Sequence, residues 1–234
     1  MTESEWLTSS DPGELTIYVY DLKAHPRKLR LLSCGYCYRI WHLLAFPGSR
    51  ELLELVDRFA DELVEPEPLA AARAEHVALL SDARRDMEGA DRYAAEAVAI
   101  TALRKIETSA DGTEVPWLVS NYAAHAAKKA EAPDDGDLAS TIELREYRAM
   151  CDLIRDIFGN PFRPVTFAPE WRTATATALA HQMYDARDFG AMPILADALQ
   201  DAGCDSDDIL SHCRNPEQVH VRGCWVVDLV LGKH

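Results

Sequence analysis

Apolar residues recur every three to four positions along most of the chain, which is the spacing that places them on one face of an α-helix. The pattern is clearest at 27–44, where leucine, isoleucine and aromatic residues alternate at helical spacing with arginine and lysine. Pro47 and Gly48 follow and end this helix. Because its apolar stripe is broad enough to touch more than one neighbour, we expect this helix to be central in the core, with Trp41 buried.

The same periodicity predicts helices along the rest of the chain. The predicted ranges are 49–63, 68–87, 89–107, 115–130, 138–158, 171–186, 189–202, 205–214 and 224–231. Residues 1–24 indicate one or two short helices, although the run at 14–22 is rich in residues that favour strands. Because no partner strand is evident, we expect helix there as well. The sequence therefore predicts an all-α protein folded as a multi-helix bundle.

The segment 131–137 is the best candidate for a linker. It is acidic, and it contains proline and glycine. Apart from one alanine, it has no apolar residue that could anchor it in a core. We therefore expect two helical subdomains, an N-terminal part at 1–130 and a C-terminal part at 138–234.

Composition excludes several partners. The chain has 234 residues and a formal net charge of −15, whereas nonspecific nucleic-acid binding and docking on anionic membranes both depend on Lys and Arg. No run of roughly 18 apolar residues is present that could span a membrane, and the first residues lack the pattern of a secretory signal. We expect a cytoplasmic protein that contacts neither nucleic acid nor membrane, with cysteines that are thiols or metal ligands rather than disulfides.

One stretch concentrates residues that can bind a metal. The chain has six cysteines and eight histidines, and five of these residues lie between 204 and 224. They are Cys204, His212, Cys213, His220 and Cys224. Zinc prefers tetrahedral sites built from thiolate and imidazole ligands, so these residues are candidate zinc ligands. Tight turns at Gly203 and Gly223 could bring them together.

Two other interpretations of this stretch stay open. The spacing lacks a close Cys-x-x-Cys knuckle, and free cysteines are commonly small buried core residues, in which case the histidines would cap helix ends or reach solvent. Alternatively, Cys224 is a nucleophile whose thiol is activated by a helix N-terminus, with His220 as its base. The apolar run after Cys224 speaks against catalysis, because it indicates a buried helix.

Two further motifs favour packing over chemistry. Cys34 and Cys37 have the Cys-x-x-Cys spacing of redox and metal motifs. No strand of a thioredoxin-like fold precedes them, and their flanks are those of a core helix, so we expect them to pack in the core. The proline-flanked segment 161–164 suits a partner-docking element, but we expect a rigid connector with Phe162 held in the core.

Several stretches together resemble a family of uncharacterised bacterial proteins that occurs in many copies in some large genomes. The stretches are MTESEWL at 1–7, RKLRLLSCGYCYRIWHLL at 27–44, DIFGNPFRPV at 156–165, MPILADALQDAGCDSDDILSHCR at 192–214 and HVRGCWVVDLVLGK at 220–233. The family pattern tends to carry a further cysteine beside Cys37, where this chain has Tyr38. The resemblance implies no activity and assigns no catalytic residue.

Two hypotheses about function follow. The leading one is a non-enzymatic cytoplasmic helical protein that binds a protein partner, because no complete catalytic set, phosphate-binding glycine loop or zinc-protease motif is present. The alternative is a small metalloprotein or redox enzyme that uses the C-terminal Cys/His cluster, with zinc as the expected metal.

Overall fold

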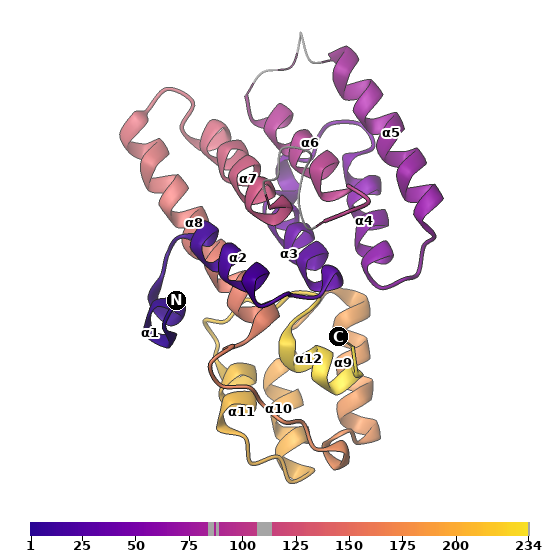
Figure 1. Cartoon of the computed structure of the whole chain (residues 1–234), viewed down its shortest axis with the longest axis vertical. Coiled ribbons are helices and arrows are strands. Elements are labelled where there is room, and N and C mark those ends of the chain that lie inside the picture. The colour runs from indigo at the N-terminus through magenta and orange to yellow at the C-terminus, as the bar shows by residue number, and fades with distance from the viewer. Residues whose placement is uncertain (84–86, 88, 107–113, 234) are drawn as a thin grey trace. The chain divides into compact units, whose positions relative to one another are not determined.

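All regular structure in the computed structural model is helical, as Figure 1 shows. The structure describes residues 1–83, 87, 89–106 and 114–233, and no strand occurs among them. The prediction of an all-α multi-helix protein is therefore confirmed. Of the helices predicted at 68–87 and 89–107, residues 84–86 and 107 lie outside the described residues.

The chain divides into two compact units. The larger unit is Thr8–Cys151, and the smaller unit combines Met1–Leu7 with Asp152–His234. The division falls within the longest helix, α8 (Gly136–Phe158), whose last residues belong to the smaller unit. The acidic segment 131–137, which we expected to separate two subdomains, joins α7 to α8 within the larger unit.

The larger unit is built around α3. Its helices are α2 (Pro12–Asp21), α3 (Pro26–Arg39), η1 (Trp41–Leu43), α4 (Ser49–Ala60), α5 (Pro66–Ala83), α6 (Ala90–Thr101), α7 (Val115–Glu131) and most of α8. Helix α3 packs against α4, α6 and α7, and its leucines and cysteines are buried. The His25 side chain caps its first turn by accepting from the Arg27 N–H.

The helix predicted at 27–44 ends earlier than expected. It closes at Arg39, and a 3₁₀ turn follows at Trp41–Leu43. The change of helix type rotates Trp41 away from the core, so its ring is half-buried rather than buried. The ring stacks on Tyr38 with 5.5 Å between centroids, and the Arg50 guanidinium covers it at 5.1 Å. The expectation that Trp41 is a core residue is wrong.

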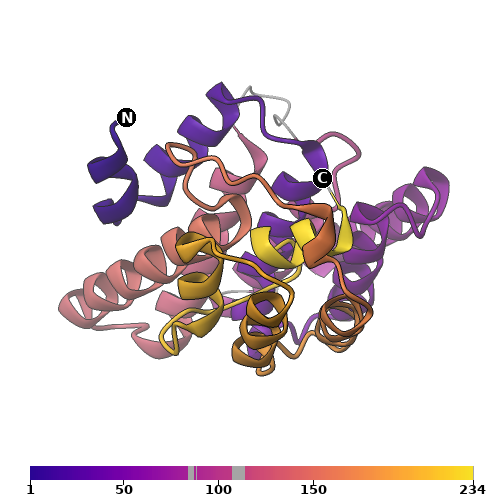
Figure 2. The ribbon, with the colours of Figure 1, turned by 90° about the horizontal axis from the view of Figure 1, so that it is seen from below.

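The smaller unit contains short helices, and those between 169 and 231 enclose an apolar core of their own. The short helices are α1 (Glu3–Thr8), η2 (Pro169–Trp171), α9 (Ala174–Ala186), α10 (Met192–Asp201), α11 (Asp207–Arg214) and α12 (Trp225–Leu231). Helix α9 packs on α10 and α12, and α11 packs on α10 and α12. Both views show the gold and yellow ribbons of α10, α11 and α12 lying together (Figures 1 and 2). The Ser206 side chain caps α11 by accepting from the Ile209 N–H.

The two remaining predictions concern the segment 161–164 and membrane spans. The segment 161–164 has no helix, and it connects α8 to η2 with Phe162 partly buried. Among the helices formed by the described residues, none combines the length and the apolar character that a membrane span requires.

Candidate metal centre

Asp156 is the buried acid at the centre of the site. It lies in the last turn of α8, beside the buried residues Leu153, Ile154 and Ile157, and its side chain is 0% exposed. A buried carboxylate is costly unless it is paired and hydrogen-bonded. Its Oδ2 accepts a hydrogen bond from the Val221 N–H at 2.9 Å, which leaves Oδ1 facing the side chains described next.

Helix α11 supplies His212. The buried residues Ile209, Leu210 and Cys213 hold this short helix against the core. The His212 Nε2 lies 3.3 Å from Asp156 Oδ1 and 3.2 Å from Cys224 Sγ.

The loop between α11 and α12 supplies the other two side chains. His220 and Cys224 stand on either side of a turn in which the Cys224 N–H donates to the Val221 carbonyl, and Gly223 adopts a positive φ of 90°. Cys224 is the N-cap of α12 and is 0% exposed. The His220 Nδ1 lies 2.8 Å from Asp156 Oδ1 and 3.8 Å from Cys224 Sγ.

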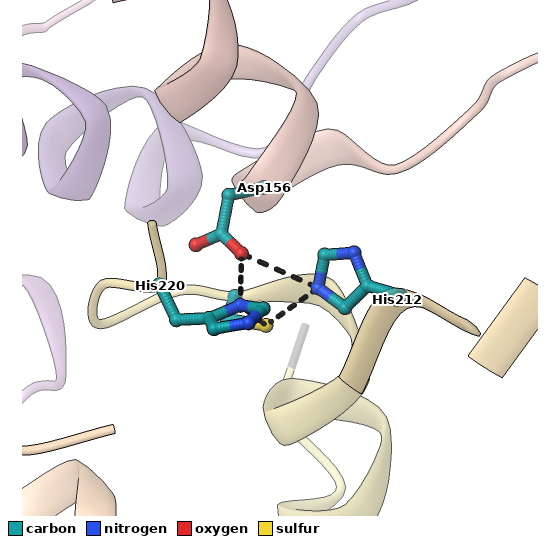
Figure 3. Close-up of side chains that lie close together, drawn as sticks. Asp156, His212 and His220 are labelled. Carbon is teal, nitrogen blue, oxygen red and sulfur yellow. Dashed lines mark hydrogen bonds and ion pairs between the residues drawn. The ribbon is translucent and has the colours of Figure 1, made fainter. Parts of the chain in front are cut away.

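The side chains of Asp156, His212 and His220 turn toward one another (Figure 3). The ligand atoms of Asp156, His212, His220 and Cys224 all lie within 4.8 Å of one another. Ligands about 2.0–2.3 Å from a tetrahedral ion are separated by roughly 3.3–3.7 Å. The four distances given above bracket that range, so this buried group could hold a metal ion.

The same geometry differs from a catalytic triad. In a triad, the histidine uses one ring nitrogen for the nucleophile and the other for the carboxylate. In this site, each histidine presents a single nitrogen to both Asp156 and Cys224: Nε2 from His212 and Nδ1 from His220. Nitrogens that converge on one point are the arrangement of metal ligands.

Burial controls the acidity of both Asp156 and Cys224. Burial would raise the pKa of Asp156, but hydrogen bonds from His212 and His220 more than offset it and hold that pKa below its ordinary value. Burial, and next the charge of Asp156, raise the pKa of the Cys224 thiol well above its ordinary value. Without a cation the sulfur therefore stays a thiol, which is a poor nucleophile. A bound metal would favour the thiolate.

The structure brings together three of the five residues that we singled out. His212, His220 and Cys224 belong to the group, whereas Cys204 and Cys213 lie in the apolar core of the smaller unit. Consecutive residues of a helix point about 100° apart, so His212 and Cys213 cannot both face one point. Burial is the main cause that raises the pKa of Cys213 to about 12, as expected of a core thiol.

Sequence reasoning missed Asp156. It precedes His212, the next member of the group along the chain, by 56 residues, and its chain neighbours gave no metal-binding spacing. The available indication was its position on the apolar face of the helix predicted at 138–158, three residues after Leu153. An acid on such a face requires partners, and histidines are suitable ones.

Cys34 and Cys37 lie in the larger unit and are both buried in α3. The Cys37 Sγ lies 3.5 Å from the Thr101 hydroxyl, and burial raises its pKa to about 12. Both thiols pack in the core.

Comparison of the chain with models of protein families, with curated proteins and with solved structures found no match. The fold and the site therefore define the protein by themselves: an all-α chain whose smaller unit contains a buried Asp/His/His/Cys group that could hold a metal ion.

Proposed function

We propose that this protein binds one zinc ion through Asp156, His212, His220 and Cys224, and that the ion has a structural rather than a catalytic role. The observation that carries the proposal is the convergence of four ligand atoms from four side chains within 4.8 Å of one another.

The donor set favours zinc. One thiolate, two imidazoles and one carboxylate combine soft and hard donors, and zinc accepts all three kinds in tetrahedral sites. Magnesium and calcium prefer oxygen ligands and are poorly matched to this set.

Closure of the site favours a structural role. Catalytic zinc keeps one position open for water or substrate, whereas structural zinc has four protein ligands. Asp156 and Cys224 are fully buried, and the side chains of His212 and His220 are only 10% and 6% exposed. This part of the proposal agrees with the non-enzymatic function expected from the sequence.

The ion would tie together elements of the smaller unit that the chain separates. Its ligands come from the end of α8, from α11, from the loop after α11 and from the N-cap of α12. Metal binding to the folded protein contributes directly to folding stability when the unfolded chain binds the metal weakly.

The experiment compares metal binding by matched cysteine variants. Protein purified without an affinity tag should contain about one zinc per chain by elemental analysis. Cys224→Ala should weaken zinc binding at least 100-fold, as loss of one of four ligands should. Cys213→Ala is the control, because Cys213 is equally buried in the same unit but lies outside the group. A wild-type chain that binds no zinc, or equal losses in the two variants, would overturn the proposal.

For the role of the whole protein we keep the leading hypothesis drawn from the sequence. We propose that the helical protein acts in the cytoplasm by binding another protein, a proposal supported by its acidic composition and by the absence of an assembled catalytic set in the sequence. A pull-down from native lysate that recovers no partner above background would count against it.

A further inference from the structure

Trp225 lies directly behind one of the proposed ligands. It is the first residue of α12, and its indole Nε1–H donates to the His212 Nδ1 at 3.2 Å. The two rings are tilted by 56° with 5.1 Å between centroids. On its other side the indole packs on the chain after α8, where a Cβ added at Gly159 would come within 3.2 Å of the Trp225 ring. The indole is therefore held against His212.

This contact determines which ring nitrogen of His212 carries the proton. An indole N–H can donate a hydrogen bond but cannot accept one. The His212 Nδ1 must therefore present its lone pair to Trp225, and the neutral ring carries its proton on Nε2. That proton faces two acceptors, Asp156 Oδ1 at 3.3 Å and Cys224 Sγ at 3.2 Å.

The proton arrangement is complete without an ion. Asp156 accepts from His220 at 2.8 Å and from the Val221 N–H at 2.9 Å, in addition to facing His212. Each N–H aimed at the site thus has an acceptor, and such pairing stabilises a buried polar network. The smaller unit can accordingly keep this arrangement when the site contains no metal.

Metal coordination requires the opposite tautomer. A metal on Nε2 uses the lone pair of that nitrogen, so the ring proton must move to Nδ1. Metal-binding histidines almost always donate this second N–H to a carboxylate, a carbonyl or a water. In this protein the second N–H of His212 would meet the Trp225 indole, which is another donor.

We infer that Trp225 is a positioning residue that opposes zinc coordination by His212, so that the ion binds reversibly and the indole turns away from His212 when it binds. The inference rests on the proposed zinc site. It assigns to Trp225 the control of metal affinity, and it makes the α12 N-terminus the part of the chain that responds to the metal.

The first test compares zinc affinity in two Trp→Phe variants by competition with a chelator. Trp225→Phe removes the opposing donor and should tighten zinc binding about 10-fold. This value is the lower end of the change in metal affinity that is usual when a residue in contact with a metal ligand is mutated. Trp171→Phe is the control, because Trp171 is a buried tryptophan of the smaller unit that lies outside the group of proposed ligands. Its affinity should stay within about 2-fold of wild type. Unchanged or weaker binding by Trp225→Phe would overturn the inference.

The second test uses the unaltered sequence, so that it holds even if Trp225→Phe folds poorly. Long-range ¹H–¹⁵N correlation spectra report the tautomer of His212. We expect the Nε2–H tautomer in metal-free protein and the Nδ1–H tautomer with zinc, together with a shifted Trp225 indole N–H resonance. The Nδ1–H tautomer in metal-free protein, or a smaller unit that unfolds when zinc is removed, would overturn the inference.

The two proposals fail in different ways. If the wild-type protein binds no zinc, the zinc site itself is refuted and the role of Trp225 falls with it. If zinc binds and Cys224→Ala abolishes binding, but Trp225→Phe and Trp171→Phe have equal affinities, only the role of Trp225 is refuted.

Discussion

At the scale of single residues, the two units each contain a buried polar side chain whose charge depends on its surroundings. Asp156 in the smaller unit keeps a lowered pKa because two histidines favour its charged form over the effect of burial. His76 in the larger unit is 3% exposed: its Nε2 lies 3.3 Å from the Ala95 carbonyl, and Phe46 packs edge-on against its ring. Burial thus favours the neutral form of His76.

His76 should make the stability of the larger unit depend on pH. Burial lowers the pKa of His76 below its ordinary value of 6.5, and it outweighs the carbonyls of Ala95 and Pro47, which favour the charged ring. The unfolded chain then binds more protons than the folded one as the pH falls through 6.5 toward the folded pKa. The free energy of unfolding should therefore decrease in that window and level off below it.

Denaturant unfolding from about pH 8 to about pH 5 measures this dependence. His76→Phe should flatten the loss of stability near pH 6.5, because it removes the group whose pKa differs between the two states. His42→Gln is the control, because His42 is exposed, and it should keep the wild-type slope. Equal slopes in the wild-type protein and His76→Phe would contradict the prediction.

At the scale of helices and turns, local residues predicted element type better than element length. The two glycines at which we expected tight turns, Gly203 and Gly223, both have positive φ. The extent of α3 was overestimated, because the apolar spacing continues to the buried Leu44 even though the helix ends at Arg39. Periodicity reports which positions are apolar, and Leu44 is buried although it follows the 3₁₀ turn rather than lying in an α-helix.

Gly203 offers a clean test of turn conformation. Its φ is +90°, and an added Cβ would meet no atom within 4 Å. Gly203→Ala should therefore cost about 1–2 kcal/mol through the backbone conformation alone. Gly136→Ala is the matched control, since its Cβ would also meet nothing within 4 Å and its φ is not positive. Thermal or denaturant unfolding measures both, and equal stabilities would contradict the prediction.

At the scale of the whole molecule, the sequence predicted the fold class and part of the site. Helical periodicity is a local property, which is why the all-α class could be read along the chain. His212, His220 and Cys224 could be singled out because they are close in sequence. Asp156 could not be singled out, because its place beside them depends on how the end of α8 packs in the smaller unit. No spacing in the local sequence predicts that packing.

Zinc should stabilise the smaller unit selectively, because all four proposed ligands belong to it. Free zinc at 100 times its dissociation constant should add about 2.7 kcal/mol to the stability of the unit that holds the site. Amide hydrogen exchange followed by mass spectrometry should therefore slow in peptides of 152–233 when zinc is added. Peptides of 8–83 and 114–151 contain no proposed ligand and should keep their exchange rates.

Cys224→Ala provides the control for that measurement. In this variant zinc should leave the exchange of both units unchanged, because one of the four ligands is lost. Cys213→Ala should keep the wild-type response, since its sulfur lies in the apolar core outside the group. Slower exchange spread evenly over both units, or a zinc effect that survives in Cys224→Ala, would place the ion elsewhere in the chain.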